Sequence, residues 1–351
     1  MSLTPYIQVN TRYTRSIHIE RDSETGSQPY ILTSRAMQVL ARVADTLDSE
    51  PKPRSFALIG PYGSGKSAFG LFLAQLLGNE ETEGSQHARN LLAVAMPTLA
   101  KNYTDSLANT PKGYCIVTMT GSPEPLARSL LRAINGAAER FFTDKKHRPT
   151  ALLQQLEAAA ASGKCKIVRL VELIAELQEA ILNNQGAGLL IIIDELGKFL
   201  EYEARHRDAT DIYLLQAIAE HGLRGQEAPL HLVVLLHQSF EQYAQTLGEQ
   251  LRNEWKKVQG RFETIPYRLY RKPSTDAAAA LPLIRFPIKS NETKPIAPIV
   301  ARRHAIWSVA TCRSMARKAA TSRRTLQNYP RIWMREKLIM VNPAFGHKIS
   351  I

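Results

Sequence analysis

Three shortages in this sequence each exclude a class of protein. The 351 residues include only three cysteines, Cys115, Cys165 and Cys312, whose spacing excludes a disulfide framework and a cysteine metal site. The longest apolar runs, such as Leu189–Ile193, are much shorter than the roughly 20 residues that a membrane-spanning helix needs. Met1–Tyr6 lacks the charged and then apolar layout of a signal peptide. We therefore expect a cytoplasmic protein that does not associate with membranes.

Acidic residues are also scarce, but only near the C-terminus. The formal net charge is +13, and Pro273–Ile351 holds 14 basic and 3 acidic residues, which leaves 31 basic and 29 acidic residues elsewhere. Most of the chain is therefore close to neutral, and the basic excess lies in its last part. A hydrophobic fraction of 44% is ordinary for a globular protein, and the length suits two domains or one α/β domain with additions.

A glycine-rich stretch after a short apolar run is the strongest signal in the sequence. Phe56–Ile59 is apolar and lies between Pro53 and Gly60, which is typical of a buried parallel strand. The residues that follow match the phosphate-binding pattern G-x-x-x-x-G-K-S/T in full, and apolar residues at helical spacing come next. The predicted nucleotide-binding residues are Gly60, Pro61, Tyr62, Gly63, Ser64, Gly65, Lys66, Ser67 and Ala68.

The chemistry of phosphate binding explains these residue types. Backbone N–H groups must converge on a polyphosphate, and side chains at Gly60, Gly63 or Gly65 would obstruct them. The N-terminus of the following helix adds partial positive charge and free donors. In such a loop Lys66 bridges the β- and γ-phosphates, and the Ser67 hydroxyl holds Mg²⁺. The alternative is a glycine-rich turn that matches the pattern by chance, which the strand and helix on either side make the weaker interpretation.

A second motif lies at the end of a continuous apolar run. Gly188–Ile193 is what a central parallel strand covered on both faces looks like, and it ends at Asp194 and Glu195. Ligands of α/β proteins bind at the carboxyl ends of such strands. We therefore predict that Asp194 supports Mg²⁺ and that Glu195 orients and polarises an attacking water. The alternative is a carboxylate pair that only caps the helix expected from Leu196 onward.

A third strand also ends in polar residues. Leu230–Leu236 is apolar and is followed by His237, Gln238 and Ser239. A polar side chain at that strand end is placed to sense the γ-phosphate, and Gln238 or His237 is the candidate. A purely structural role is equally consistent with the sequence, and Ser239 is also suited to cap the next helix.

The order of these motifs resembles the AAA+ ATPases and their relatives in the additional-strand class of P-loop enzymes. The resemblance spans about residues 30–270 and includes Gly260–Glu263, which precedes a last predicted strand. In that family an arginine at this place reaches the γ-phosphate of the neighbouring subunit. The resemblance therefore implies ATP as ligand, a homo-oligomer, and Arg261 as the arginine acting in trans, with Arg252 as second choice. A surface salt bridge is the alternative role for Arg261.

The resemblance extends less clearly to the rest of the chain. Asp194–Leu200 looks like part of the ATPase modules of large bacterial multidomain proteins, some of them linked to phage defence. The AAA+ family continues into a helical lid with another arginine, which the sequence does not assign, and Arg317 and Arg323 are no more than candidates for it. The basic tail is then a divergent lid, a disordered arm that contacts nucleic acid phosphates, or the product of a shifted reading frame or truncated gene. The last is slightly favoured, because acidic residues and regular patterning fade together.

The predicted fold is a three-layer α/β P-loop core, with a mostly parallel sheet and helices on both faces. Helices over Ala151–Ala161 and Ile167–Asn183 form an insertion between the two nucleotide motifs, at about 145–185. Ser16–Glu20 is predicted as a short strand and Asn79–His87 as a loop.

Three parts of the chain follow from this pattern. We expect an N-terminal extension at 1–28, a P-loop ATPase domain at 29–271 and a basic, poorly patterned tail at 272–351. Tyr30 and Ile31, at the start of the predicted domain, are candidates for contact with the nucleotide base, and surface packing is the alternative.

The sequence predicts a Mg²⁺-dependent ATPase that drives a conformational or DNA-associated process. The alternative from another class is a nucleotide-dependent switch, or a regulator that binds nucleic acid, with little turnover. Transfer of phosphate to a small molecule is less favoured, because the pair Asp194 and Glu195 suits water as the nucleophile.

Overall fold

The computed structural model describes most of the first 267 residues and a short segment near the C-terminus. One α/β unit spans Ile17–Leu269, and a separate antiparallel pair is formed by β6 (Ile339–Asn342) and β7 (His347–Ser350). Arg317, Arg323 and most of the basic tail lie outside the described residues. Within the described part of the chain no helix is both long and apolar enough to cross a membrane. The described ranges are 17–22, 30–144, 147–206, 211–224, 227–243, 249–267, 339–342 and 347–350.

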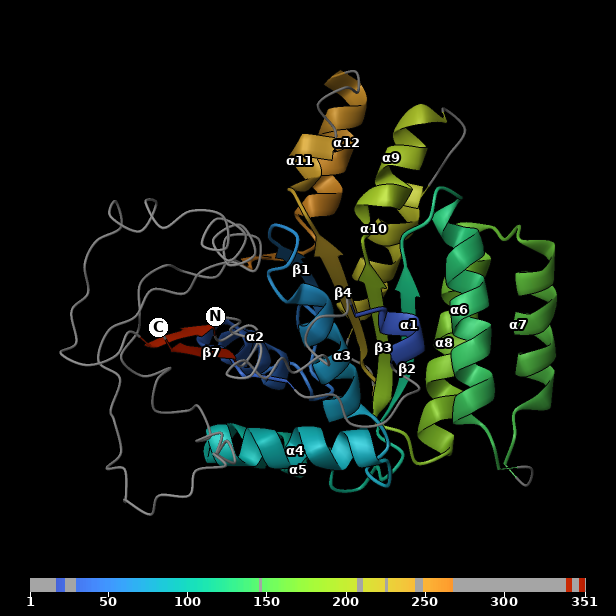
Figure 1. Cartoon of the computed structure of the whole chain (residues 1–351). Coiled ribbons are helices and arrows are strands. Elements are labelled where there is room, and N and C mark those ends of the chain that lie inside the picture. Colours follow the sequence, from blue (N-terminus) through green and yellow to red (C-terminus); the bar gives the residue numbers. More distant parts are fainter. Residues whose placement is uncertain are drawn as a thin grey trace, which may run out of the picture. The chain divides into compact units, whose positions relative to one another are not determined.

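The α/β unit contains a five-stranded sheet in which every neighbouring pair is parallel (Figure 1). The strand order is β2-β3-β4-β1-β5, so β4 lies between the strand before the glycine-rich loop and the strand that ends in Asp194. Parallel strands bring their carboxyl ends to one edge, where ligands of such sheets bind. The predicted parallel sheet is confirmed. The strands are β1 (Ser55–Ile59), β2 (Tyr114–Thr120), β3 (Gly188–Asp194), β4 (Leu230–Leu236) and β5 (Glu263–Pro266).

Alternating side chains of the central strands pack into two separate cores. Ala57, Ile191 and Val234 belong to one cluster, and their neighbours Leu58 and Ile192 belong to the other. Because side chains alternate along a strand, the two clusters lie on opposite faces of the sheet. The three central strands β1, β3 and β4 are almost wholly buried, as their continuous apolar sequences predicted.

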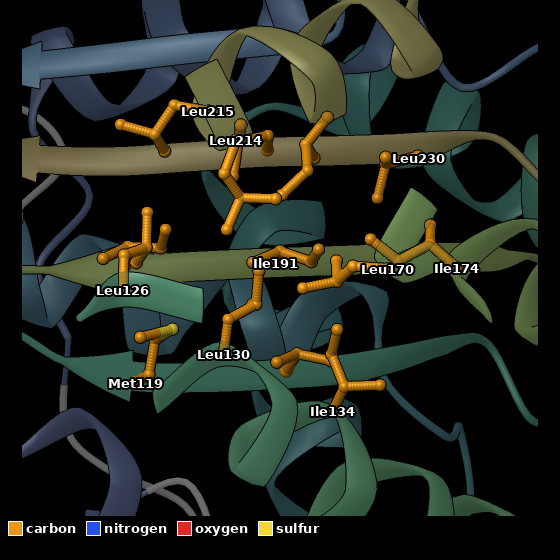
Figure 2. Packing of buried hydrophobic residues seen from close by; sticks show 14 of the residues in the cluster. Met119, Leu126, Leu130, Ile134, Leu170, Ile174, Ile191, Leu214, Leu215 and Leu230 are labelled. Atoms are coloured by element: carbon orange, nitrogen blue, oxygen red, sulfur yellow. The ribbon is translucent and has the colours of Figure 1, made fainter. Parts of the chain in front are cut away.

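Helices cover both faces, which confirms the predicted three layers. One core is completed by α6, α7, α8 and α10, and Figure 2 shows its centre, where Ile191 of β3 lies among leucines and isoleucines of three helices. The other core is completed by α2, α3, α4 and α5. The helices are α1 (Ile19–Asp22), α2 (Ser34–Ala44), α3 (Lys66–Leu77), α4 (Glu83–Ala95), α5 (Pro97–Leu107), α6 (Leu126–Phe141), α7 (Thr150–Ser162), α8 (Ile167–Asn183), α9 (Gly197–Arg205), α10 (Asp211–Gly222), α11 (Phe240–Tyr243) and α12 (Glu249–Gln259).

The predicted helical insertion is present as α7 and α8. Gly163 ends α7 with a φ of 62°, a left-handed conformation that favours glycine and explains the break between the two helices. The helices α7 and α8 contact each other, and α7 also packs on α6 (Figure 1). The insertion therefore thickens one face of the sheet and lies away from the carboxyl end of β1.

Two local predictions were wrong. Ser16–Glu20 was predicted as a strand, but Ile19–Asp22 is a single helical turn in which the Asp22 carboxylate accepts a hydrogen bond of 2.8 Å from the His18 N–H. The predicted loop at Asn79–His87 ends early, because α4 begins at Glu83. Thr82 caps this helix, and its hydroxyl accepts a hydrogen bond of 3.3 Å from the Ser85 N–H. In both cases a local polar contact determines the backbone where the apolar pattern is weak.

Candidate functional site

The glycine-rich loop joins the carboxyl end of β1 to the first turn of α3, as predicted. Gly63 and Gly65 have φ values of 74° and 87°, which favour glycine, and a Cβ atom at either would meet no heavy atom within 4 Å. Gly60 is required for another reason, since its Cβ would lie 2.0 Å from the carbonyl oxygen of Tyr267. The loop therefore has open space around Gly63 and Gly65, whereas at Gly60 it packs tightly against the main chain of Tyr267.

Lys66 is the first residue of α3 and turns back under this loop. Its side chain is buried, and Nζ donates hydrogen bonds of 2.7 Å to the Gly60 carbonyl and 3.0 Å to the Pro61 carbonyl. Burial lowers the pKa of Lys66, and the negative charges of Asp194 and Glu195 oppose that shift. The ammonium group thus lies within electrostatic reach of both acidic residues.

Asp194 connects the second motif to the first. It is the last residue of β3 and is only 6% exposed, and the Ser67 side chain of α3 lies close enough to its carboxylate to help lower its pKa. Burial raises the pKa of Asp194, although the Ser67 hydroxyl and the Glu195 N–H, 2.8 Å from Oδ1, act in the opposite direction. The structure therefore places the two oxygen ligands predicted for Mg²⁺ side by side.

These residues fit a magnesium ion held jointly with a ligand. A buried carboxylate with a raised pKa is incompletely compensated by the protein, and a cation beside it would remove that cost. Among the described residues no group of three or more His, Cys, Asp or Glu side chains forms a metal cage. Magnesium characteristically binds through one or two carboxylates together with substrate phosphates and water, which is what Asp194 and Ser67 would allow.

Glu195 lies in a tightly packed turn directly after β3. Its φ of 51° is uncommon for a residue other than glycine, and its carbonyl oxygen would lie 2.1 Å from a Cβ atom on Gly121. The carboxylate forms an ion pair with Lys198, three residues further along the chain in α9. A strained backbone held by its surroundings is often found at functional sites. The structure thus fixes the main chain of Glu195 and pairs its side chain with a lysine that the sequence analysis did not single out.

The end of β4 contributes His237 to the same region. The His237 ring stacks on the ring of Tyr62 in the glycine-rich loop, with centroids 3.5 Å apart. Its Nδ1 is buried and has no hydrogen-bond partner in the described part of the chain. Burial and the charge of Lys66 lower the pKa of His237. Of the two residues considered at this strand end, His237 is therefore the one placed against the loop.

Gln238 is held mainly through its backbone. The main chains of His237 and Gln238 lie close to the Tyr243 hydroxyl and oppose the rise of its pKa, which desolvation brings to about 12. A Cβ atom on Gly197 would lie 2.1 Å from that hydroxyl oxygen. Tyr243 therefore packs between the turn after β3 and the end of β4, and a γ-phosphate contact by Gln238 stays a prediction.

Arg261 lies at the opposite edge of the sheet from the loop. It precedes the amino end of β5, and β5 runs parallel to β1. Its guanidinium donates a hydrogen bond of 2.9 Å from Nε to the Glu220 carboxylate and pairs with it through a second nitrogen. The structure does not bring Arg261, or the exposed Arg252 of α12, to the site of its own chain. A role in a neighbouring subunit's site stays a prediction.

Tyr30, one of the two candidates for base contact, is engaged in packing. Its hydroxyl lies 3.3 Å from the Tyr267 hydroxyl, and its ring stacks on Phe72 with centroids 4.7 Å apart. Ile31 is 39% exposed. Tyr30 thus fits the packing alternative.

Comparison with known proteins gives likenesses to solved structures. No family model and no curated protein matches the sequence. Among solved structures, the chain is similar to the ORC2 protein of Aeropyrum pernix in its ADPNP-ADP complexes, with 12% identity and a TM-score of 0.42. The match covers 78% of this chain and 54% of that chain, so this chain spans about half the length of that protein. At this TM-score the likeness assigns neither a family nor an activity, and the likeness to phage-defence ATPase modules finds no support.

Proposed function

We propose that the chain binds ATP at Gly60–Ser67 and hydrolyses it to ADP and phosphate with Mg²⁺. The observation that carries this proposal is the proximity of the Ser67 side chain to the Asp194 carboxylate, because it brings the two sequence motifs together at one edge of the sheet. Lys66 lies within reach of the same carboxylates. A glycine-rich loop, a lysine, a hydroxyl and two carboxylates are the parts that P-loop hydrolases use.

Each residue has a distinct role in this proposal. The loop and Lys66 bind the β- and γ-phosphates, and Ser67 and Asp194 hold the magnesium ion. When bound, Mg²⁺ supplies positive charge that offsets the charge developing on the phosphate oxygens. Glu195 orients the attacking water and accepts its proton, and His237 donates to or accepts from the γ-phosphate region through its unpaired Nδ1.

The nucleoside preference and the assembly follow from the resemblance to AAA+ ATPases. That resemblance implies ATP, and it implies a homo-oligomer in which Arg261 of one subunit completes the site of the next. The strand β4 lies between β1 and β3, and this is the position of the additional strand after which that class is named. The exposed position of Arg261 on the far edge of the sheet is compatible with contact to another subunit.

Two substitutions test the proposal. Lys66→Ala should reduce ATP affinity by at least tenfold, since it removes the charge that neutralises the phosphates. Glu195→Gln should leave affinity within about twofold and reduce steady-state phosphate release by at least a hundredfold, because general-base removal typically costs this much. Lys101→Ala, at an exposed position on α5, is the matched control and should change neither quantity. Equal ATP affinity in the wild type and in Lys66→Ala would refute the site.

A switch with little turnover is the second candidate function. The observation that favours it is the ion pair of Glu195 with Lys198, which occupies the carboxylate that hydrolysis requires. Steady-state phosphate release with and without DNA distinguishes the two functions. Salt-dependent retention of the chain on DNA, compared with a chain ending at Lys272, tests whether the basic tail is the part that binds nucleic acid.

A further inference from the structure

A polar cavity lies one strand away from Asp194. It has a volume of about 610 Å³ and opens beside the carboxyl end of β2, where its lining includes Thr118–Ser122. Thr120 is the register partner of Asp194 in the β2–β3 pair, and the Gly121 N–H donates a hydrogen bond of 2.8 Å to the Asp194 carbonyl. The cavity, called the β2 recess here, is therefore attached to the backbone that carries the proposed catalytic carboxylates.

Basic side chains outnumber acidic ones in the lining of the β2 recess. Arg132 and Arg140 of α6 and Lys198 of α9 line it together with Glu20 and Glu124. Both carboxylates are already engaged. Glu20 accepts a hydrogen bond of 2.5 Å from the Thr120 N–H, and Glu124 is paired with Arg132.

One hydroxyl group in the lining of the recess has not been used by the protein. The Thr120 hydroxyl is buried and has no hydrogen-bond partner in the described part of the chain. The hydroxyls of Ser122 and Ser129 donate hydrogen bonds of 2.9 and 2.6 Å to the Glu124 carboxylate, so this carboxylate already has partners within the protein. The recess thus offers positive charge and a buried hydroxyl, a combination that suits a carboxylate or a phosphate group.

Lys198 belongs both to the recess and to the proposed active site. It lines the cavity, and its ammonium group forms the ion pair with Glu195. That pairing raises the pKa of Lys198, so the lysine stays charged. The side chain is 47% exposed and can change partners at little cost, because exposed ion pairs contribute weakly.

We propose that the β2 recess binds an anionic group, a carboxylate or a phosphate, and that this anion draws Lys198 away from Glu195. Occupancy of the recess then frees the carboxylate that acts on water, so an anionic ligand activates hydrolysis. This regulation rests on the proposed function, whereas the anion site itself does not. The nucleotide site and the recess remain separate, because the loop at Gly60–Ser67 does not line the cavity.

Calorimetry on the full chain tests the anion site without any turnover. Inorganic phosphate and succinate are titrated separately into the chain after a non-hydrolysable ATP analogue has saturated the P-loop. If the analogue does not bind, which would count against the proposed function, the Lys66→Ala chain is titrated instead. The double variant Arg132→Gln/Arg140→Gln should weaken binding of the preferred anion by at least tenfold, and Arg128→Gln on the same helix should leave it unchanged. Absence of binding by both anions, or equal binding by wild type and double variant, would overturn the site.

Phosphate release tests the link to Glu195. Lys198→Met should raise basal turnover roughly two- to fivefold, the range expected from loss of an exposed ion pair. The anion that binds should raise wild-type turnover to a similar level and should not raise that of Lys198→Met. Unchanged or reduced turnover in Lys198→Met would overturn the link, even if the anion binds. An ATP analogue that binds without any hydrolysis would count against the proposed function and leave the calorimetric result standing.

Discussion

At the scale of single residues, contiguous motifs were predictable and pairings across the fold were not. Lys66, Asp194 and Glu195 could be found because each belongs to a short pattern tied to one strand end. Lys198 and the stack of Tyr62 on His237 could not, since the first looks like any helical lysine and the second joins residues far apart in sequence. The charge three residues after Glu195 is the only local signal for the Lys198 pair.

His231 shows how one buried residue makes stability depend on pH. It lies in β4 with no exposure, its Nε2 is 3.0 Å from the Thr46 hydroxyl, and burial lowers its pKa to about 3. Because the unfolded chain binds the proton near pH 6.5 and the folded chain does not, this contribution to stability is complete above pH 6.5 and declines as the pH falls toward 3. We expect His231 alone to lower the free energy of unfolding by about 2 kcal/mol between pH 7 and pH 5.

Urea unfolding of wild type and His231→Gln at both pH values measures this effect. The variant should lose less stability than the wild type over the same interval, because it lacks the group that takes up the proton. Burial also lowers the pKa values of His221 and His237, so part of the pH dependence should remain in the variant. Parallel pH dependence in the two proteins would contradict the assignment.

At the scale of elements, long buried segments were predictable and short ones were not. Leu230–Leu236 was predicted with the bounds that β4 has, because a strand buried on both faces has an apolar sequence from end to end. The four residues of α1 are too few to show a helical period, and the turn depends on the contact between His18 and Asp22. Element type thus follows from the apolar pattern where burial is extensive.

Arg54 ties three elements together at the amino end of β1. Its side chain is fully buried, and it donates hydrogen bonds to the carbonyl groups of Thr46 at 2.9 Å, Asp48 at 2.7 Å and Gly222 at 3.3 Å. Arg54→Met leaves these carbonyls unpaired and should lower the free energy of unfolding by about 3 kcal/mol. Denaturant unfolding measures the change.

A nearby lysine provides the control for Arg54. Lys52 is partly exposed and pairs with Asp48 and Glu50, so Lys52→Met should change the free energy of unfolding much less than Arg54→Met does. Similar losses in Arg54→Met and Lys52→Met would show that the buried contacts of Arg54 do not hold these elements together.

At the scale of the whole molecule, the parallel α/β architecture was predictable, but which of its surfaces contact another subunit was not. Alternating apolar strands and helices indicate a parallel sheet, but the order of the strands depends on packing between distant segments. Arg261 illustrates the remaining gap. Its pair with Glu220 fits a surface salt bridge, and action on a neighbouring subunit is a property of an assembly rather than of one chain.

Mixing two inactive variants tests whether Arg261 acts in trans. Lys66→Ala and Arg261→Ala should each abolish phosphate release, and their equimolar mixture should recover about a quarter of wild-type activity if subunits exchange in a head-to-tail assembly. Glu220→Gln keeps the arginine but removes its partner, so it should remain active. Loss of activity in Glu220→Gln, or no recovery on mixing, would favour a structural role for Arg261.

The close approach of Tyr267 to Gly60 has a mechanical consequence. The Tyr267 N–H donates a hydrogen bond of 2.6 Å to the Ile59 carbonyl, and its own carbonyl lies where a Gly60 side chain would be. Tyr267 is thus anchored directly behind the glycine-rich loop. In the proposed function, a displacement of the loop on gaining or losing a γ-phosphate would therefore be transmitted directly to the main chain at Tyr267.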